Sequence, residues 1–198
     1  MTQLRIVAAS AAADTAGLAN NITGTSGTAL VLAATDSGDD LAHPLIITNN
    51  SANDYSAGGK AFAIVGTNAN GEPQTESLVG PAASVTTTST KYWLGYTSIT
   101  PNFTSAAAAF DVGWTVDSVS PWEFINYPWG PQGLGFGCTV DSGSPTYTVQ
   151  HQYGDGTAQN HSSLAGETTN QSGSYVAPVR AVRLSFAAAG NVTLNGQY

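Results

Sequence analysis

The chain has 198 residues, of which only 9% are charged, and its formal net charge is −8. An average soluble domain is about a quarter charged, so hydroxyls, amides and small side chains must cover this surface, which suits permanent assembly. Its five basic residues are dispersed, whereas binding a phosphate backbone requires clustered Lys or Arg. We therefore expect no direct nucleic-acid partner.

The N-terminal part of the chain is weakly patterned. The start, Met1–Val7, lacks the basic start, apolar run and cleavage site of a secretory signal, and no stretch approaches the roughly 18 apolar residues of a membrane span. We expect a protein that is made and assembled in a cytoplasm, with no membrane partner. Residues 8–40 are rich in Ala, Thr, Gly and Ser. The segment 1–40 is therefore expected to form either an arm that orders against a neighbour or an edge strand with long loops.

Residues 41–117 are predicted to form a first β module. A strand over 60–67 has alternating apolar residues, and the pair Asn70-Gly71 that follows is the preferred pair for a tight hairpin turn because both positions tolerate positive φ. Further strands predicted from an apolar period of two span 72–79, 92–96 and 112–116.

Residues 118–198 are predicted to form a second β module. The run 146–153 places Tyr147, Val149, His151 and Tyr153 on one face, and strands are also predicted over 179–186 and 191–195. Glycine or proline falls at almost every joint, and no segment shows a helical apolar stripe. The predicted fold class is all-β, with two antiparallel β-sandwich or jelly-roll-like modules and an extended N-terminal arm.

The segment 121–137 opens the second module and is rich in proline, glycine and aromatic residues. Its three prolines and four glycines are expected to prevent a regular ladder. Trp122, Tyr127 and Trp129 are the candidate packing or interface anchors. They can fill a seam between the modules or anchor a neighbouring subunit. We favour the seam, because adjacent aromatic residues usually fill the core of their own chain.

Cys138 is the only cysteine, which excludes an intramolecular disulfide and zinc sites with several thiolates. Catalytic thiolates need an activating neighbour, and no ionisable residue follows before Asp141, so we predict a buried core thiol. Gly133–Gly137 lacks the spacing of a dinucleotide fingerprint and a following helix, so a turn or a close backbone approach is expected there.

Other candidate ligands and nucleophiles are equally unpromising. Asp36, Asp39 and Asp40 lack the spacing and closing Glu of a calcium loop, which favours a solvated turn. The histidines His43, His151 and His161 are too scattered for a metal site, although the last two flank a Gly-Asp-Gly turn, and hydrogen-bonded strand histidines are the better account. No nucleophile-elbow motif occurs. We expect no catalytic residues, no metal and no cofactor, and we predict that the protein is not an enzyme.

Five segments stand out: Leu41–Asp54, Ala61–Pro81 and Ser89–Leu94 in the first module, and Tyr147–His151 and Tyr175–Leu184 in the second. Together they resemble β-rich virion proteins of tailed bacteriophages, and the resemblance covers about residues 41–198.

The resemblance implies a virion structural protein, specifically a capsid decoration (cement) protein on the outer surface of the assembled head. Its implied partners are the major capsid protein and further copies of itself in a homotrimer, and its implied location is the capsid surface, after assembly in the host cytoplasm. A tail, neck or fibre component would share this composition. A carbohydrate-binding β-sandwich with Trp122 and Trp129 as stacking platforms is the other alternative.

Overall fold

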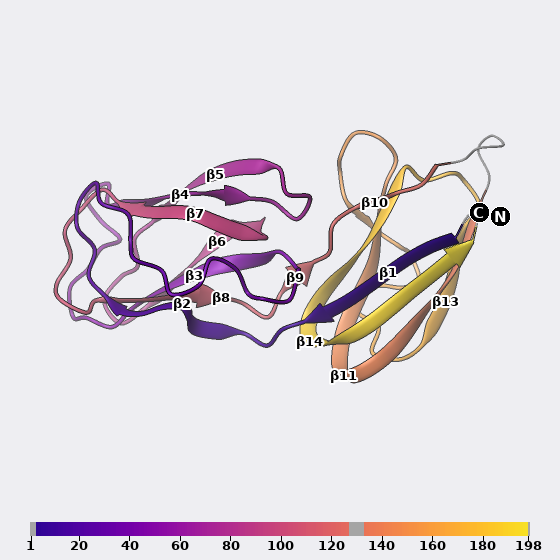
Figure 1. Ribbon diagram of the computed structural model, residues 1–198, viewed down its shortest axis with the longest axis horizontal. Helices are drawn as coiled ribbons and strands as arrows, with labels where there is room; N and C mark the ends of the chain where they lie inside the picture. Colours follow the sequence, from indigo (N-terminus) through magenta and orange to yellow (C-terminus); the bar gives the residue numbers. More distant parts are fainter. Residues whose placement is uncertain (1–2, 127–132, 198) are drawn as a thin grey trace. The chain divides into compact units, whose positions relative to one another are not determined.

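The computed structural model describes residues 3–126 and 133–197, and these ranges contain strands, turns and irregular segments but no helix. All strand pairing is antiparallel, as the register of each sheet shows. The prediction of an all-β chain is therefore confirmed (Figure 1). The chain divides into two compact units. Unit 1 comprises Met1–Ala12, Asp39–Leu41 and Val116–Tyr198, and unit 2 comprises Ala13–Gly38 and Ala42–Thr115.

Unit 2 is a sandwich of two antiparallel sheets. The four-stranded sheet has the order β2-β8-β3-β6 and the three-stranded sheet the order β5-β4-β7. Both sheets contribute side chains to one buried cluster, as expected when two half-apolar sheets pack face to face. The strands are β2 (Asp14–Ile22), β3 (His43–Asn49), β4 (Ala61–Thr67), β5 (Pro73–Val79), β6 (Thr86–Trp93), β7 (Gly95–Pro101) and β8 (Phe110–Trp114).

The centre of unit 2 is aromatic. Phe110 lies edge-on to Phe62, with ring centroids 5.3 Å apart, and edge-on to Tyr55 at 5.1 Å. Phe103 stacks on Tyr55 at 5.1 Å. Edge-to-face pairs place the positive rim of one ring against the negative face of another, which adds to the gain from burial. These rings come from both sheets and from the loops after β3 and β7 and so join the layers.

The predicted strand over 92–96 is wrong, because two strands of different sheets meet there. β6 ends at Trp93 and belongs to the four-stranded sheet, whereas β7 begins at Gly95 in the three-stranded sheet. Trp93 and Tyr96 are both buried, and their rings stack with centroids 5.8 Å apart. A straight strand would direct residues three apart to opposite faces, so the chain must switch sheets between them.

The hairpin between β4 and β5 is confirmed, but its turn is longer than the sequence predicts. Thr67 pairs with Pro73, which leaves five residues in the loop, and Gly71 N donates to Asn68 O at 2.9 Å. Within this loop only Gly71 has a positive φ, of 78°, and the Asn68 side chain accepts hydrogen bonds from the backbone N–H groups of Asn70 and Glu72. The asparagine side chain thus takes over part of the turn that two positive-φ residues would make.

Unit 1 is built around one long antiparallel pair, β11 and β14. β14 pairs with β1, β9 and β10, and β11 pairs with β12 and β13. Together these strands form a seven-stranded sheet. The register of the long pair shifts between Val140 and Tyr147, which divides each long strand into two halves. The strands are β1 (Gln3–Ser10), β9 (Ser118–Val119), β10 (Glu123–Phe124), β11 (Leu134–Gln152), β12 (Gln159–Asn160), β13 (Gln171–Tyr175) and β14 (Ala181–Gln197).

Two paired glycines mark the point where β11 and β14 bend. Gly143 lies opposite Gly190, and their φ angles are 76° and 153°, which side-chain-bearing residues rarely adopt. A Cβ on Gly190 would lie 2.7 Å from Pro145 Cδ. The bend therefore requires glycine, both for its backbone angles and for the space beside Pro145.

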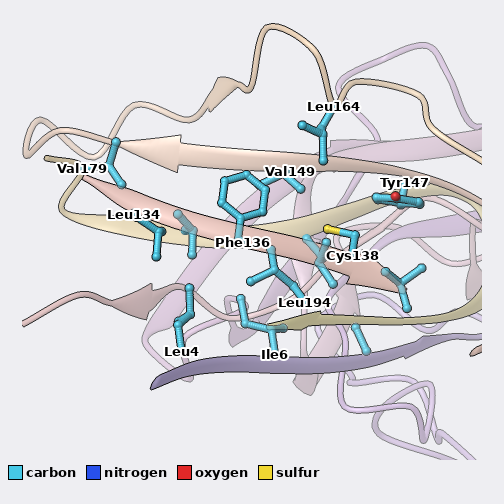
Figure 2. Packing of buried hydrophobic residues seen from close by; sticks show 14 of the residues in the cluster. Leu4, Ile6, Leu134, Phe136, Cys138, Tyr147, Val149, Leu164, Val179 and Leu194 are labelled. Atoms are coloured by element: carbon cyan, nitrogen blue, oxygen red, sulfur yellow. The ribbon is translucent and has the colours of Figure 1, made fainter. Parts of the chain in front are cut away.

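The bend brings both halves of the long pair onto one core. Figure 2 shows Leu4 and Ile6 of β1 toward one side of this cluster and Tyr147, Val149 and Leu164 toward the other. Alternate residues of each half are buried, which is the period of two expected for half-buried strands. The complete cluster consists of Leu4, Ile6, Ala8, Leu41, Ile125, Leu134, Phe136, Cys138, Tyr147, Val149, Leu164, Tyr175, Val179, Val182, Leu184, Phe186, Val192 and Leu194.

Residues 3–40 follow the edge-strand alternative and not the arm. β1 pairs with the C-terminal half of β14 in unit 1, and β2 pairs with β8 in unit 2, and each lies at the edge of its sheet. The first strand alternates strictly between exposed and buried residues. Its apolar residues are covered by strands more than a hundred residues away in sequence, which is why local patterning gave an ambiguous result.

The expectation of an irregular segment over 121–137 is also wrong in part. β11 begins at Leu134 and pairs regularly with β13 and β14 from that residue onward. Gly135 and Gly137 lie on the outward side of this ladder, opposite the buried Leu134 and Phe136. Glycine removes a side chain but keeps its N–H, so it weakens a strand without breaking the ladder as proline does.

Candidate interaction surface

Trp122, the first of the candidate anchors, packs on an arginine of its own unit. The Arg183 guanidinium carbon lies 4.4 Å from the centroid of the Trp122 ring, within the range of a cation–π contact. Trp122 precedes the short strand β10 and is partly buried, whereas Arg183 lies on β14. Tyr127 and Trp129, the other two predicted anchors, lie outside the described residues.

A second aromatic–cation pair lies beside the first. Phe124 of β10 is 53% exposed, and the Arg180 guanidinium lies 5.6 Å from its ring centroid. The pairing of β10 with β14 fixes this position, since Phe124 lies opposite Ala181 and Glu123 opposite Val182. Arg180 is held further by a bond from Nη1 to the carbonyl of Gly154 at 3.3 Å. We call Trp122, Phe124, Arg180 and Arg183 the aromatic–arginine edge.

A row of planar polar side chains continues from this edge across the sheet. Arg183 Nε donates to Gln150 Oε1 at 2.8 Å, and Gln150 Nε2 donates to Asn160 Oδ1 at 3.0 Å. The three residues are register neighbours on β14, β11 and β12. Each bond restricts the rotamers of both partners, so the guanidinium that supports Trp122 is held in one orientation. A preorganised arginine and tryptophan lose little conformational entropy when a partner binds.

Unit 1 also carries a shallow hollow of about 670 Å³ on the outward side of β1, β14 and β11. Its floor is open because Gly135 and Gly137 have no side chains there, and its polar groups are amides and one guanidinium. These groups can donate hydrogen bonds to the flat surface of a partner and accept hydrogen bonds from it. The side chains around it are Gln3, Arg5, Asn195 and Gln197.

Two of the three acidic residues near Gly38, Asp36 and Asp39, accept hydrogen bonds from backbone N–H groups. Asp36 accepts from the N–H of Gly38 at 3.0 Å, and Asp39 accepts from Ala11 at 2.8 Å and from Leu41 at 3.1 Å. Asp40 has a positive φ of 60°, as turn aspartates often do. Among residues 3–126 and 133–197, no group of three or more His, Cys, Asp or Glu residues is placed to hold a metal ion.

The histidines differ in how far their ring nitrogens are satisfied. His43 is buried, and its Nδ1 donates to the carbonyl of Thr115 at 2.9 Å. His161 donates from Nε2 to the carbonyl of Ser174 and accepts at Nδ1 from the N–H of Ser163, both at 3.3 Å. His151 is buried, and its Nδ1 has no hydrogen-bond partner. The expectation of hydrogen-bonded strand histidines therefore fails for His151 Nδ1, and His161 lies just after β12.

Cys138 is a core residue of unit 1, as predicted. It is 2% exposed, and burial raises the pKa of its thiol to about 12. A thiol with so high a pKa is almost entirely protonated near neutral pH and therefore a poor nucleophile.

The arginines of the edge were not singled out from the sequence. The alternation over 179–186 places Arg183 on the strand face opposite that of the apolar residues Val182 and Leu184. This pattern indicates that the Arg183 side chain faces outward. Its contact with Trp122 joins residues about sixty positions apart. No local pattern indicates such a contact.

The part of the chain that the structure describes has no helix long and apolar enough to cross a membrane. Comparison with known proteins found no matching family model, and no curated protein or solved structure is significantly similar to the chain.

Proposed function

We propose that this chain is a structural protein of a tailed-bacteriophage virion, and specifically a capsid decoration protein that binds the outer surface of the assembled head. In this proposal its partners are the major capsid protein and other copies of itself in a homotrimer. The resemblance of its β-strand segments to phage virion proteins supports the class. The aromatic–arginine edge supports a role in binding another protein.

The observation that carries the proposal is the pairing of Trp122 with Arg183 and of Phe124 with Arg180 along one edge. Tryptophan, tyrosine and arginine are the residues that dominate binding energy at protein interfaces. The chain has only five Lys and Arg residues, so two of them beside the partly buried Trp122 and the exposed Phe124 are a concentration of its cations. The half-exposed ring of Phe124 leaves apolar area that a partner can cover.

Decoration requires many weak or moderate contacts that act together across joints of the shell. A protein that binds the assembled shell, and not its separated subunits, stabilises the shell by mass action. Its charge-poor surface provides hydroxyl and amide groups for close, hydrated contacts. The net charge of −8 keeps free copies soluble and mutually repelling before they dock.

Copy number tests the proposal first. Quantitative mass spectrometry of purified particles of the encoding virus measures this chain relative to the major capsid protein. A ratio near one to one supports decoration of the head. A few copies per hundred would assign the chain to the neck, tail or fibre instead, and absence from particles would exclude a virion role.

A binding assay tests the edge directly. Purified Phe124→Ala and Trp122→Ala variants are added to heads that lack the protein, and the bound fraction is measured by sedimentation. We expect each variant to bind at least about tenfold more weakly, because interface anchors of this kind contribute about 1–3 kcal/mol or more. Val7→Ala, a change at a 60% exposed strand residue, is the matched control and should bind normally.

Folding and oligomeric state complete this test. Circular dichroism and light scattering show whether each variant folds and forms the same oligomer as the parent chain. Normal head binding by folded Phe124→Ala and Trp122→Ala variants would refute the edge as the docking surface. A monomeric parent chain at micromolar concentration would refute the trimer.

A further inference from the structure

A pocket of about 270 Å³ lies at the end of unit 1 where β11, β12 and β13 finish. It is separate from the residues of the aromatic–arginine edge. Aromatic and imidazole rings form much of its wall, and the other lining residues supply hydroxyls, an amide and the small apolar side chains of Val176 and Ala177. The side chains that matter are His151, Tyr153, Asn160, His161, Ser174 and Tyr175.

The rings around the pocket hold one another in place. The Tyr175 ring centroid lies 4.8 Å from that of His151 and 4.9 Å from that of His161. Tyr153 lies edge-on to His151 at 5.1 Å and is itself 52% exposed. The pocket therefore combines buried, fixed rings with one aromatic face at its rim. Such a site is largely formed before a ligand arrives.

Two buried polar atoms of these rings lack partners. His151 Nδ1 and the Tyr175 hydroxyl have no hydrogen-bond partner, although the two residues are only 6% and 8% exposed. Leaving a buried donor or acceptor unpaired costs stability, so each case in a folded protein requires an explanation. Within the described ranges, Trp93 Nε1 and Tyr96 Oη are also unpaired, but they lie in the aromatic core of unit 2 and line neither pocket. Of these four atoms, only the two in unit 1 belong to residues that line one of the two pockets described above.

The hydrogen bonds already made around the pocket and the charges of its lining residues restrict the class of ligand that it can bind. Both ring nitrogens of His161 already have partners, in Ser163 and Ser174, so His161 shapes the wall and is not available to a ligand atom. Burial, together with the nearby His161, lowers the pKa of His151, which favours its neutral ring. None of the lining residues is acidic, and none is Lys or Arg. A charged ligand would therefore lose its hydration without gaining a counter-charge.

We propose that this pocket binds one neutral sugar ring, such as a terminal hexose of a glycan. Sugar hydroxyls both donate and accept hydrogen bonds, which matches the Tyr175 hydroxyl and His151 Nδ1. The C–H face of a sugar ring packs on an exposed aromatic ring, the role available to Tyr153. The volume suits a single ring and excludes a long buried oligosaccharide.

This inference does not rest on decoration of the capsid, because the pocket and the edge share no residue. A chain that binds sugar and is absent from heads, or the reverse, separates the two proposals. Head sedimentation and sugar binding are independent measurements on the same purified protein.

Saturation-transfer NMR on the full chain tests the pocket. The probes are D-glucose, D-galactose, D-mannose and N-acetyl-D-glucosamine at pH 7.5. We expect saturation transfer to at least one sugar, with a dissociation constant of about a millimolar, the range for a ligand of few polar contacts. Absence of transfer to all four would refute the proposal.

Two variants distinguish binding from a merely structural role. Tyr175→Phe removes the unpaired hydroxyl and keeps the ring, so a purely structural hydroxyl predicts unchanged or higher thermal stability and unchanged binding. Sugar contact predicts at least about fivefold weaker binding, which is the loss of one hydrogen bond. Tyr153→Ala, at the exposed rim, should also bind more weakly, whereas Val7→Ala should not. Equal binding by Tyr175→Phe and the parent chain would overturn the assignment. So would a crystal structure of the chain soaked in the sugar that shows only a water molecule bound to the Tyr175 hydroxyl.

Discussion

The two units of this chain reach the same layered β architecture by different routes. Unit 2 assembles seven separate strands into two sheets, and its layers are joined by rings such as Phe62 and Phe110. Unit 1 bends one long strand pair at Gly143 and Gly190, so that the halves of β11 and β14 contribute to both sides of one core. A sandwich needs two half-apolar faces, and the chain can reverse between them either through loops or through a glycine bend.

The difference extends to polar groups inside the cores. The Tyr55 hydroxyl in unit 2 accepts from the N–H of Ala106 at 2.9 Å, and Asn49 there makes several bonds to the backbone. Among the described residues each unit also has two unpaired buried atoms: Trp93 Nε1 and Tyr96 Oη lie in the aromatic core of unit 2, whereas His151 Nδ1 and Tyr175 Oη in unit 1 belong to residues that line a pocket. Its ring cluster stands at an end of the sheet, where a ligand can enter.

The largest expected effect is loss of the aromatic centre of unit 2. Phe110→Ala should destabilise unit 2 by about 3–5 kcal/mol, the usual cost of truncating a buried phenylalanine, because Phe110 contacts Tyr55, Phe62 and Phe103. Hydrogen exchange with mass spectrometry measures protection in each unit. We expect the loss within unit 2, since the two cores share no residue. Equal loss of protection in both units would show that they unfold as one cooperative body.

The bend of unit 1 should be the next most sensitive feature. Gly190→Ala should cost about 1–3 kcal/mol, because its φ of 153° is strained for any side chain and the new methyl group would meet Pro145. Gly135→Ala is the matched control: no atom lies within 4 Å of its added Cβ, so the change should be neutral or stabilise by at most about 1 kcal/mol. Chemical denaturation measures both. Similar free energies of unfolding for the two variants would show that the bend does not require glycine at position 190.

The smallest expected effect is a difference in acid sensitivity. His151 faces His161, Tyr153 and Tyr175, and its folded pKa lies below its ordinary value of 6.5 because of burial. The unfolded chain therefore takes up the proton first as the pH falls, so unit 1 should lose stability below about pH 6.5. The pKa of Asp54, in unit 2, is also lowered, but the protonation of this carboxylate affects stability only below about pH 3.8, its ordinary pKa.

Thermal unfolding at pH 7.5 and 5.5 measures this difference. The melting temperature of unit 1 should fall by a few degrees at the lower pH, as expected for a change on the order of 1 kcal/mol. His151→Phe cannot take up a proton there and should reduce that fall. An unchanged fall in His151→Phe would show that another group is responsible.

The candidate surfaces were predictable only in part. Trp122 was recognised as an aromatic residue that needs a partner, yet its partner Arg183 comes from a strand far along the chain. The sequence placed His151 and His161 near one turn, but it did not place Tyr175 between them. Ring contacts of this kind depend on which strands become neighbours, and alternation reports only the face on which a residue lies.

Local sequence was enough to predict the strand character of the chain, the hairpin around Gly71 and the inward residues of strands such as β4 and β11, because period-two alternation and turn chemistry are local properties. Tertiary structure decided the pairing of β1 with β14, the change of sheet after Trp93 and the joining of two predicted runs into β14. These features depend on apolar faces being covered by distant segments. The free energy of that burial belongs to both partners together, so neither segment alone specifies it.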